Sequence, residues 1–231
     1  MSSTDELIAH LRTFVTDERW ERLNEVLSQR TRRLTVVLED IYQPHNASAV
    51  LRSCDCFGIQ DVHIIENENR FTLSSEVTVG SDQWLTLERY RGEEDNTRRC
   101  LRHLREGGYR LVATTPHEEG EKETVDIDRL PLDRPIALLF GSELPGLTGR
   151  ALEEADLCTR IPMLGFSESY NISVSAALSL YELSLRMRRT LPRDKWELPE
   201  QDRRGLLLRW LKTSLRAGEE LAEKFLRERE E

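Results

Sequence analysis

Two polar side chains in the segment NASAVLR are of types that could do chemistry: Asn46, which begins it, and Arg52, which ends it. The segment follows a β-branched apolar run at 34–39 and is typical of a helix that Gly58 closes. Each residue also has an ordinary explanation, since Asn commonly caps a helix and Arg commonly covers a solvated helix face. Their place at the mouth of a strand-to-helix connection favours a site instead. A guanidinium there can hold an anion, but it rarely acts as a base because it presents donors and no acceptor.

A second group of candidates lies in the stretch 136–185. Ile136–Phe140 is apolar on both faces and predicts a buried strand that stops at Gly141. Asn171 can cap a helix whose first residues, 172–178, are mostly small, so that another backbone or a ligand can come close. A strand, a glycine turn and a helix start together predict a ligand site, although Gly141 could also be simple turn punctuation.

The sequence lacks the features of a phosphate-binding P-loop, a dinucleotide site, a metal site and a membrane or secreted protein. The segment 141–148 begins like a phosphate-binding P-loop, but Leu147 stands where the lysine of that motif must be. No GxGxxG follows a predicted strand, which argues against a dinucleotide site. The histidines have no ligand-like spacing and the cysteines match no zinc framework, so we expect no metal. No apolar run is long enough to span a membrane and the N-terminus lacks the apolar core of a signal peptide, so we expect a cytoplasmic protein without membrane contact.

Strands and helices alternate along the chain, which predicts an α/β fold with a mostly parallel sheet covered on both faces. The predicted strands are 34–39, 62–65, 84–87, 109–114 and 136–140, and the predicted helices include 4–13, 17–30, 46–57 and 94–106. The segment 116–134 is expected to be a charged surface loop. The run 160–164 contains Pro162, which favours an edge strand or a turn. An apolar stripe in the tail, from Leu207 to Phe225, predicts helices that pack on the main domain or form a dimer contact.

The net charge of −9 at first counts against a nucleic-acid partner. Acidic and basic side chains balance in 1–33 and in 191–231, however, so the whole acidic excess lies in 34–190. A basic patch can therefore persist locally. Two arginine clusters are the candidates for it: Arg30, Arg32 and Arg33, and Arg186, Arg188 and Arg189.

Three motifs, taken in order, resemble those of the SPOUT methyltransferases, and in particular of the TrmH/SpoU family of tRNA (guanosine-2′-O)-methyltransferases. The first is Asn46 with Arg52, the second is LFGSE at 139–143 followed by Gly146, and the third is IPMLG at 161–165 followed by NISVSAA at 171–177. Each motif alone is a weak signal, and the resemblance covers roughly residues 16–190. The third motif has Tyr170 where the family more often has leucine, which changes the pocket shape that is expected.

The resemblance implies a fold, an assembly and a cofactor. The fold would be a SPOUT domain at 34–190 with a deep trefoil knot in about 110–185, flanked by helical extensions at 1–33 and 191–231. Such a knot is a rare exception to the rule that chains do not thread through themselves. The assembly would be a homodimer and the cofactor S-adenosylmethionine. The residues implied to hold the cofactor are Thr114, Leu139, Phe140, Gly141, Ile161, Met163, Leu164, Gly165, Ser169, Tyr170, Asn171 and Ser173.

The resemblance also implies roles in a reaction, which is methyl transfer to a ribose 2′-oxygen. Arg52 would act as the general base or, more conservatively, would bind a neighbouring phosphate and stabilise the developing alkoxide. Glu143 would orient Asn46 and Arg52 from across the site. The two arginine clusters would contact tRNA phosphates.

The implied substrate is tRNA, and most specifically guanosine 18 of the D-loop. The same chemistry on ribosomal RNA is one alternative, but related enzymes of that kind carry an added N-terminal RNA-binding domain, for which the 33 residues before the first strand are too few. A non-catalytic RNA-binding dimer on the same fold is a second alternative. The joint retention of Asn46, Arg52, Glu143 and Asn171 argues against it.

Overall fold

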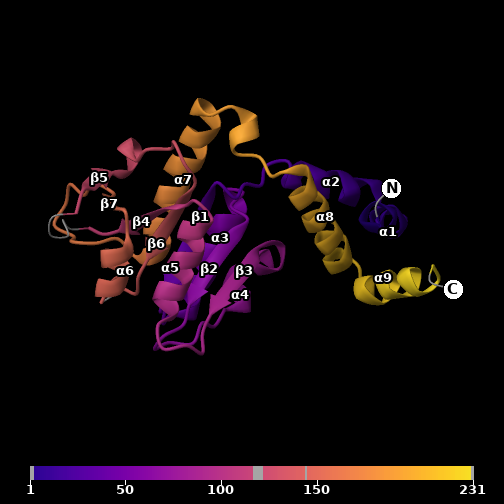
Figure 1. Ribbon diagram of the computed structural model, residues 1–231, viewed down its shortest axis with the longest axis horizontal. Helices are drawn as coiled ribbons and strands as arrows, with labels where there is room; N and C mark the ends of the chain where they lie inside the picture. Colours follow the sequence, from indigo (N-terminus) through magenta and orange to yellow (C-terminus); the bar gives the residue numbers. More distant parts are fainter. Residues whose placement is uncertain (1–2, 117–121, 144, 230–231) are drawn as a thin grey trace. The chain divides into compact units, whose positions relative to one another are not determined.

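The computed structural model describes residues 3–116, 122–143 and 145–229 (Figure 1). Two compact units divide the chain: one joins Met1–Arg30 with Glu197–Glu231, and the other is Thr31–Trp196. The two ends of the chain, which the sequence suggests are separate extensions, thus belong to one helical unit. Within the described residues no helix is both long and apolar enough to cross a membrane.

The helical unit contains α1 (Ser3–Arg12), α2 (Asp17–Leu27), α8 (Glu200–Ser214) and α9 (Gly218–Arg227). Thr16 caps α2, because its side chain accepts a hydrogen bond from the Arg19 amide at 3.2 Å. The apolar stripe of α8, with Trp210 at its centre, is buried where α8 meets α1 and α2. The tail therefore packs on the N-terminal helices, a partner that differs from the main domain or dimer suggested by the sequence.

In the described part of the α/β unit every strand pair is parallel, in the order β3-β2-β1-β6-β4-β7-β5 (Figure 1). The strands are β1 (Leu34–Glu39), β2 (Asp61–Ile65), β3 (Thr86–Tyr90), β4 (Arg110–Thr114), β5 (Thr124–Asp126), β6 (Ile136–Phe140) and β7 (Leu157–Arg160). The helices are α3 (Pro44–Cys56), α4 (Ser75–Thr78), α5 (Asn96–Glu106), α6 (Gly149–Glu154) and α7 (Ile172–Thr190), with 3-10 turns η1 (Ser81–Trp84), η2 (Ile127–Arg129) and η3 (Arg193–Lys195). The predicted parallel α/β fold is confirmed.

Alternation along the strands builds an apolar core on each face of the sheet. On β1, Val36 and Leu38 belong to a core with residues of α3 and α7, whereas Val37 belongs to a core with residues of α5 and α6. The helices thus cover both faces, and the carboxyl ends of the strands remain at one edge, where loops can build a site.

The segment 116–134 is not the continuous loop that the sequence predicts. Residues 124–126 form β5, which pairs with β7, and 127–129 form η2, while 117–121 lie outside the described residues. Three residues are too few to carry a periodic pattern, so only the pairing with β7 defines this strand. β7 lies between β4 and β5 rather than at an edge, and it ends before Pro162.

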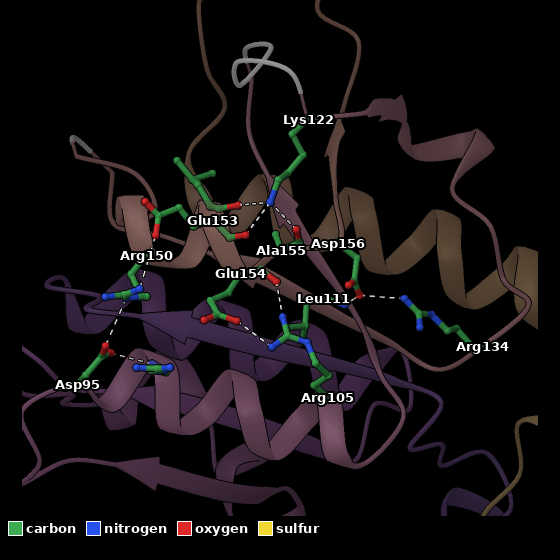
Figure 2. A network of polar contacts seen from close by, with 12 residues as sticks. Asp95, Arg105, Leu111, Lys122, Arg134, Arg150, Glu153, Glu154, Ala155 and Asp156 are labelled. Carbon is green, nitrogen blue, oxygen red and sulfur yellow. Dashed lines mark hydrogen bonds and ion pairs between the residues drawn. The ribbon is translucent and has the colours of Figure 1, made fainter.

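A polar network fixes the short helix α6, which the sequence does not predict (Figure 2). Lys122 donates to backbone carbonyls at the carboxyl end of this helix, those of Leu152, Glu153 and Ala155. Arg105 of α5 binds the Glu154 carboxylate at 2.8 Å and its carbonyl at 2.7 Å. These donors replace the helical partners that a helix end lacks, so α6 has little freedom to shift.

A buried histidine makes the α/β unit sensitive to acid. His63 of β2 is 4% exposed, and its Nδ1 lies 3.1 Å from the Tyr90 hydroxyl. Burial lowers the pKa of His63 from 6.5 to about 4, although the Glu88 carboxylate acts in the opposite direction. The stability contributed by neutral His63 is therefore complete above pH 6.5 and is lost as the pH falls from 6.5 toward 4.

Between pH 8 and pH 5, we expect the free energy of unfolding to fall by about 2 kcal/mol more in the wild type than in a His63→Gln variant. Urea unfolding of both proteins at the two pH values measures this difference. His103, a neighbour whose side chain is exposed, provides the control, because His103→Gln should follow the wild type. Equal pH dependence of the wild type and His63→Gln would contradict the assignment to His63.

Candidate active site

A cavity of about 550 Å³ opens at the carboxyl ends of β4, β6 and β7. Parallel α/β sheets bind ligands at this edge, and small-molecule sites have volumes of roughly 300–1,000 Å³. The lining residues come from the ends of these strands, the loops that follow them, α6 and the first turns of α7. In the part of the chain that the structure describes, no cluster of His, Cys, Asp and Glu could hold a metal ion.

The loop after β6 folds back on itself beside this cavity. Ser142 and Gly146 exchange two backbone hydrogen bonds, of 3.1 and 3.0 Å, and Gly146 has a φ of +72°. A Cβ on Gly141 would lie 2.1 Å from the carbonyl carbon of Gly146. Gly141 is therefore required by a close approach of two backbone segments, which is a stronger constraint than turn punctuation.

Asn46 reaches the same loop from α3. The helix begins at Pro44 with Gln43 as its N-cap, so Asn46 lies inside the first turn and is not the cap. Its Nδ2 donates to the Glu143 carboxylate and, at 3.0 Å, to Gln43 Oε1. The Asn46 side chain is consequently held toward the end of β6.

Asn171 completes a polar cluster with Asn46 and Glu143. Its Nδ2 donates to Glu143 Oε1 at 2.8 Å and to Asn46 Oδ1 at 3.2 Å. Its Oδ1 accepts from the amide and the hydroxyl of Ser173, at 2.9 and 2.6 Å, and so caps α7 as predicted. One carboxylate thus ties together the end of β6, the start of α3 and the start of α7.

Arg52 lies on α3, less than two turns beyond Asn46, and its side chain is exposed. Glu143 does not bind it, so the expectation that Glu143 orients Arg52 is corrected: the carboxylate holds Asn46 and Asn171. Among the described residues no hydrogen bond or ion pair engages the Arg52 guanidinium. Its donors are available to an external anion.

Many of the residues expected at the cofactor line the cavity: Thr114, Phe140, Gly141, Ile161, Met163, Ser169 and Tyr170. The others lie elsewhere. Leu139 is buried in the sheet, and Leu164 and Gly165 are exposed, so none of the three lines the cavity. Asn171 and Ser173 belong to the polar cluster.

The cavity also contains lining residues that the sequence analysis did not assign to cofactor binding: Thr115, Pro116, Ser142, Pro145, Leu147, Leu152, Thr159, Arg160, Glu168, Ile172, Ser175 and Ser179. Arg160 ends β7, and its Nε donates to Asp126 Oδ1 of β5 at 2.9 Å. The sequence did not reveal this pair, because it predicted a loop, and not a strand, at Asp126. Glu168 lies between the two parts of the third motif, and its charge was the signal that could have marked it.

Most of the arginines expected to contact RNA are engaged within the protein. Arg30 is 1% exposed, and its guanidinium lies 5.2 Å from the centre of the Trp210 ring. This residue belongs to the core of the helical unit, so the surface contact expected of it is corrected. The cause is the stacking of a weakly hydrated guanidinium on an aromatic face.

The remaining arginines of these clusters differ in how far other residues of the protein engage their side chains. Arg32 binds the Asp61 carboxylate at 2.8 Å, and Arg33 donates to the Leu132 carbonyl at 2.8 Å. Arg186 donates to two backbone carbonyls of the η2 turn region, and Arg188 lies over the Trp196 ring at 5.1 Å. Arg189 is exposed at the end of α7.

Known proteins are similar to this chain in sequence over most of its length. A model of the SpoU rRNA Methylase family matches residues 33–181. The tRNA (guanosine(18)-2′-O)-methyltransferase of Borreliella burgdorferi is 42% identical over 183 residues, which are 79% of this chain and 80% of that protein. The enzyme of the same name from Thermus thermophilus is 33% identical over 197 residues, 85% of this chain and 97% of that protein.

Solved structures show the same fold. The TrmH/SpoU tRNA modifying enzyme of Aquifex aeolicus has a TM-score of 0.75 and 27% identity, covering 86% of this chain and 98% of that one. The AdoMet-bound rRNA methyltransferase of Sinorhizobium meliloti has a TM-score of 0.58 and 26% identity, covering 71% of this chain and 59% of that one. Through the family match over most of its length and its identity to these relatives, the chain belongs to the SpoU rRNA methylase family.

Proposed function

We propose that this chain transfers a methyl group from S-adenosylmethionine to the ribose 2′-oxygen of guanosine 18 in tRNA. The observation that carries this proposal is the Asn46–Glu143–Asn171 cluster. Glu143 lines a ligand-sized cavity, and Asn46 lies on the same helix as Arg52, whose guanidinium no described residue binds. Family membership supports the reaction type, because relatives that match most of the chain are named for it. A cytoplasmic location fits this substrate.

The cavity residues fit S-adenosylmethionine. Ile161, Met163 and Leu147 offer apolar contact to an adenine ring, and Gly141 lets the Gly146 and Leu147 backbone lie close to it at the cavity wall. Glu168 offers a negative charge to a cofactor that carries a positive one. When bound, this cofactor supplies an electrophilic methyl group on a sulfonium centre.

The protein contributes charge and position to the transfer. Arg52 binds a phosphate near the target ribose and stabilises negative charge as it develops on the 2′-oxygen. We favour this role over that of a general base, because a guanidinium presents five donors and no acceptor. Glu143 is a positioning residue that holds Asn46 and Asn171. Arg189, which is exposed, is our remaining candidate for a further tRNA phosphate contact.

We further propose that about 110–185 forms the trefoil knot of SPOUT domains. The segments after β4, β6 and β7, which all fall in this range, meet around one cavity. The small residues at the start of α7 allow backbone segments to pass close together. An experimental structure that traces 110–185 without a break tests the threading, and a chain that straightens when its two ends are pulled would contradict it.

A homodimer is the assembly that we propose, with α7 in the interface. Val174, Leu178 and Tyr181 follow one face of this helix and are 43, 41 and 54% exposed. Leu164 and Phe166, in the loop before α7, are fully exposed. An aligned set of exposed apolar side chains is typical of an interaction surface. α3 packs on α7, so this interface would lie close to the helix that carries Arg52.

A Leu178→Glu substitution is expected to raise the dimer dissociation constant at least about 100-fold, because it buries an unpaired charge in the interface. Sedimentation velocity over a range of protein concentrations measures the constant. Leu226 on α9 is exposed to a similar extent and gives the matched control, since Leu226→Glu should remain dimeric. A folded Leu178→Glu protein that dimerises like the wild type would exclude this interface.

The proposed activity is tested by incubating purified protein and methyl-labelled cofactor with transcripts of tRNA or ribosomal RNA. The expected result is label in tRNA, mapped to the ribose of guanosine 18 and absent from a tRNA that carries 2′-deoxyguanosine there. Label in ribosomal RNA alone would support the alternative substrate. Cofactor binding without transfer to either RNA would support the non-catalytic RNA-binding dimer.

A further inference from the structure

A buried carboxylate, that of Glu39 at the end of β1, contacts Thr148, which follows the loop after β6. Glu39 is 2% exposed. Its Oε1 accepts from the Thr97 hydroxyl at 2.6 Å and from the Thr148 hydroxyl at 2.9 Å, and its Oε2 accepts from the Thr148 amide at 2.9 Å. A carboxylate in the interior is costly unless donors surround it, and here three donors do so.

Thr148 connects this carboxylate to the wall of the cavity. It follows Gly146 and Leu147, which both line the cavity. It also caps α6, because its hydroxyl accepts from the Ala151 amide at 3.2 Å. The position of Thr148 therefore determines where Gly146 and Leu147, the last residues of the loop after β6, lie.

The opposite end of α6 is fixed independently. Lys122 and Arg105 bind the carbonyls and the carboxylate at the carboxyl end of this helix (Figure 2). The helix cannot slide to compensate for a change at its amino end. Because the carboxyl end of α6 is held in place, the hydrogen bonds to Glu39 determine the position of Thr148 at its amino end.

We propose that Glu39 is a positioning residue for cofactor binding, which acts through Thr148 to hold Gly146 and Leu147 in the shape that receives the cofactor. This inference rests on the proposed function for the identity of the ligand. Glu39 lines no part of the cavity, so it takes no part in the transfer itself. Its effect should appear in the affinity for the cofactor and not in the rate of the chemical step.

A Glu39→Gln substitution tests the requirement for a carboxylate. The Thr148 amide and hydroxyl both donate to Glu39. Glutamine can keep its oxygen toward the amide, but its NH2 group would then face the hydroxyl, which would lose its charge-assisted donor role. Loss of one charge-assisted hydrogen bond should weaken cofactor binding by roughly 10- to 100-fold. The KM for the cofactor should rise by a similar factor, while kcat stays within about three-fold of the wild type.

The readouts are calorimetric titration with S-adenosylmethionine, steady-state kinetics, and amide hydrogen exchange of 145–148 without cofactor. Exchange in this segment should be faster in Glu39→Gln than in the wild type. Thr97→Val is the matched control, because it removes a donor to Glu39 that does not belong to the loop. It should leave cofactor affinity within about three-fold of the wild type.

A second pair of variants keeps the test decisive if Glu39→Gln does not fold. Thr148→Val removes the hydroxyl and should weaken cofactor binding, whereas Thr148→Ser keeps it and should restore the affinity. Unchanged affinity and exchange in a folded Glu39→Gln protein, equal losses in Thr97→Val and Glu39→Gln, or equal affinities of Thr148→Val and Thr148→Ser would each overturn the inference. Failure of the wild type to bind S-adenosylmethionine would refute the proposed function, and the exchange experiment would still decide the role of Glu39.

Discussion

Alanine at Arg52 is expected to lower the rate of methyl transfer to tRNA at least about 100-fold, while the Kd for S-adenosylmethionine stays within about two-fold of the wild type. The side chain is exposed on α3 and does not line the cavity, so its removal leaves the cavity walls intact. Loss of one preorganised donor to a developing oxyanion costs roughly 10²–10³ in rate. Single-turnover transfer and cofactor titration measure the two quantities separately.

Two further variants sharpen this experiment. Arg52→Lys keeps the charge but loses the planar fork of donors, so it should still be slowed by about ten-fold or more. Arg189→Ala removes another exposed arginine of the same unit. It should weaken tRNA binding, while the rate of methyl transfer to tRNA that is already bound should not fall comparably. If Arg52→Ala lost cofactor binding as much as methyl transfer, the role of Arg52 in the transfer step would be contradicted.

Alanine at Gly141 should destabilise the α/β unit by about 3 kcal/mol and abolish measurable cofactor binding. The added Cβ would lie 2.1 Å from the carbonyl carbon of Gly146 and 2.2 Å from the Leu147 amide nitrogen. These neighbours are backbone atoms, and the Ser142–Gly146 hydrogen bonds hold them in place. The loop must therefore open, which changes the cavity wall. Urea unfolding and cofactor titration measure both effects.

Gly149, a few residues further along, gives the matched control. It is the first residue of α6, and a Cβ built there meets no atom within 4 Å. Gly149→Ala should therefore leave stability unchanged or raise it slightly, since alanine favours a helix by roughly 0.5–1 kcal/mol over glycine. If Gly141→Ala matched the wild type in both stability and cofactor affinity, close backbone approach would not be what glycine provides there.

The sequence by itself determined the elements that depend on neighbouring residues. The β-branched run at 34–39 and the apolar run at 136–140 predicted β1 and β6, and Asn171 predicted the cap of α7. Hydrophobic periodicity and capping are local properties, so they can be read without the fold. The order of the motifs likewise sufficed for the family resemblance, which the comparisons confirm.

Short elements and the roles of arginines were decided by contacts between distant residues. β5 has three residues and exists through its pairing with β7, and α6 has six. An arginine has the same local sequence signature whether it binds RNA or packs inside, and only the neighbouring Trp210 ring made Arg30 a core residue.

The site itself was decided by the tertiary structure. Asn46 and Glu143 are 97 positions apart in the chain, and their hydrogen bond exists because β1 and β6 are adjacent in the sheet. For the same reason, Glu143 accepts a hydrogen bond from Asn171 and does not bind Arg52, and Glu39 accepts one from Thr148. Residue types fixed which groups could accept or donate, but the pairing of strands distant in sequence chose their partners, because a hydrogen bond forms only within about 3 Å.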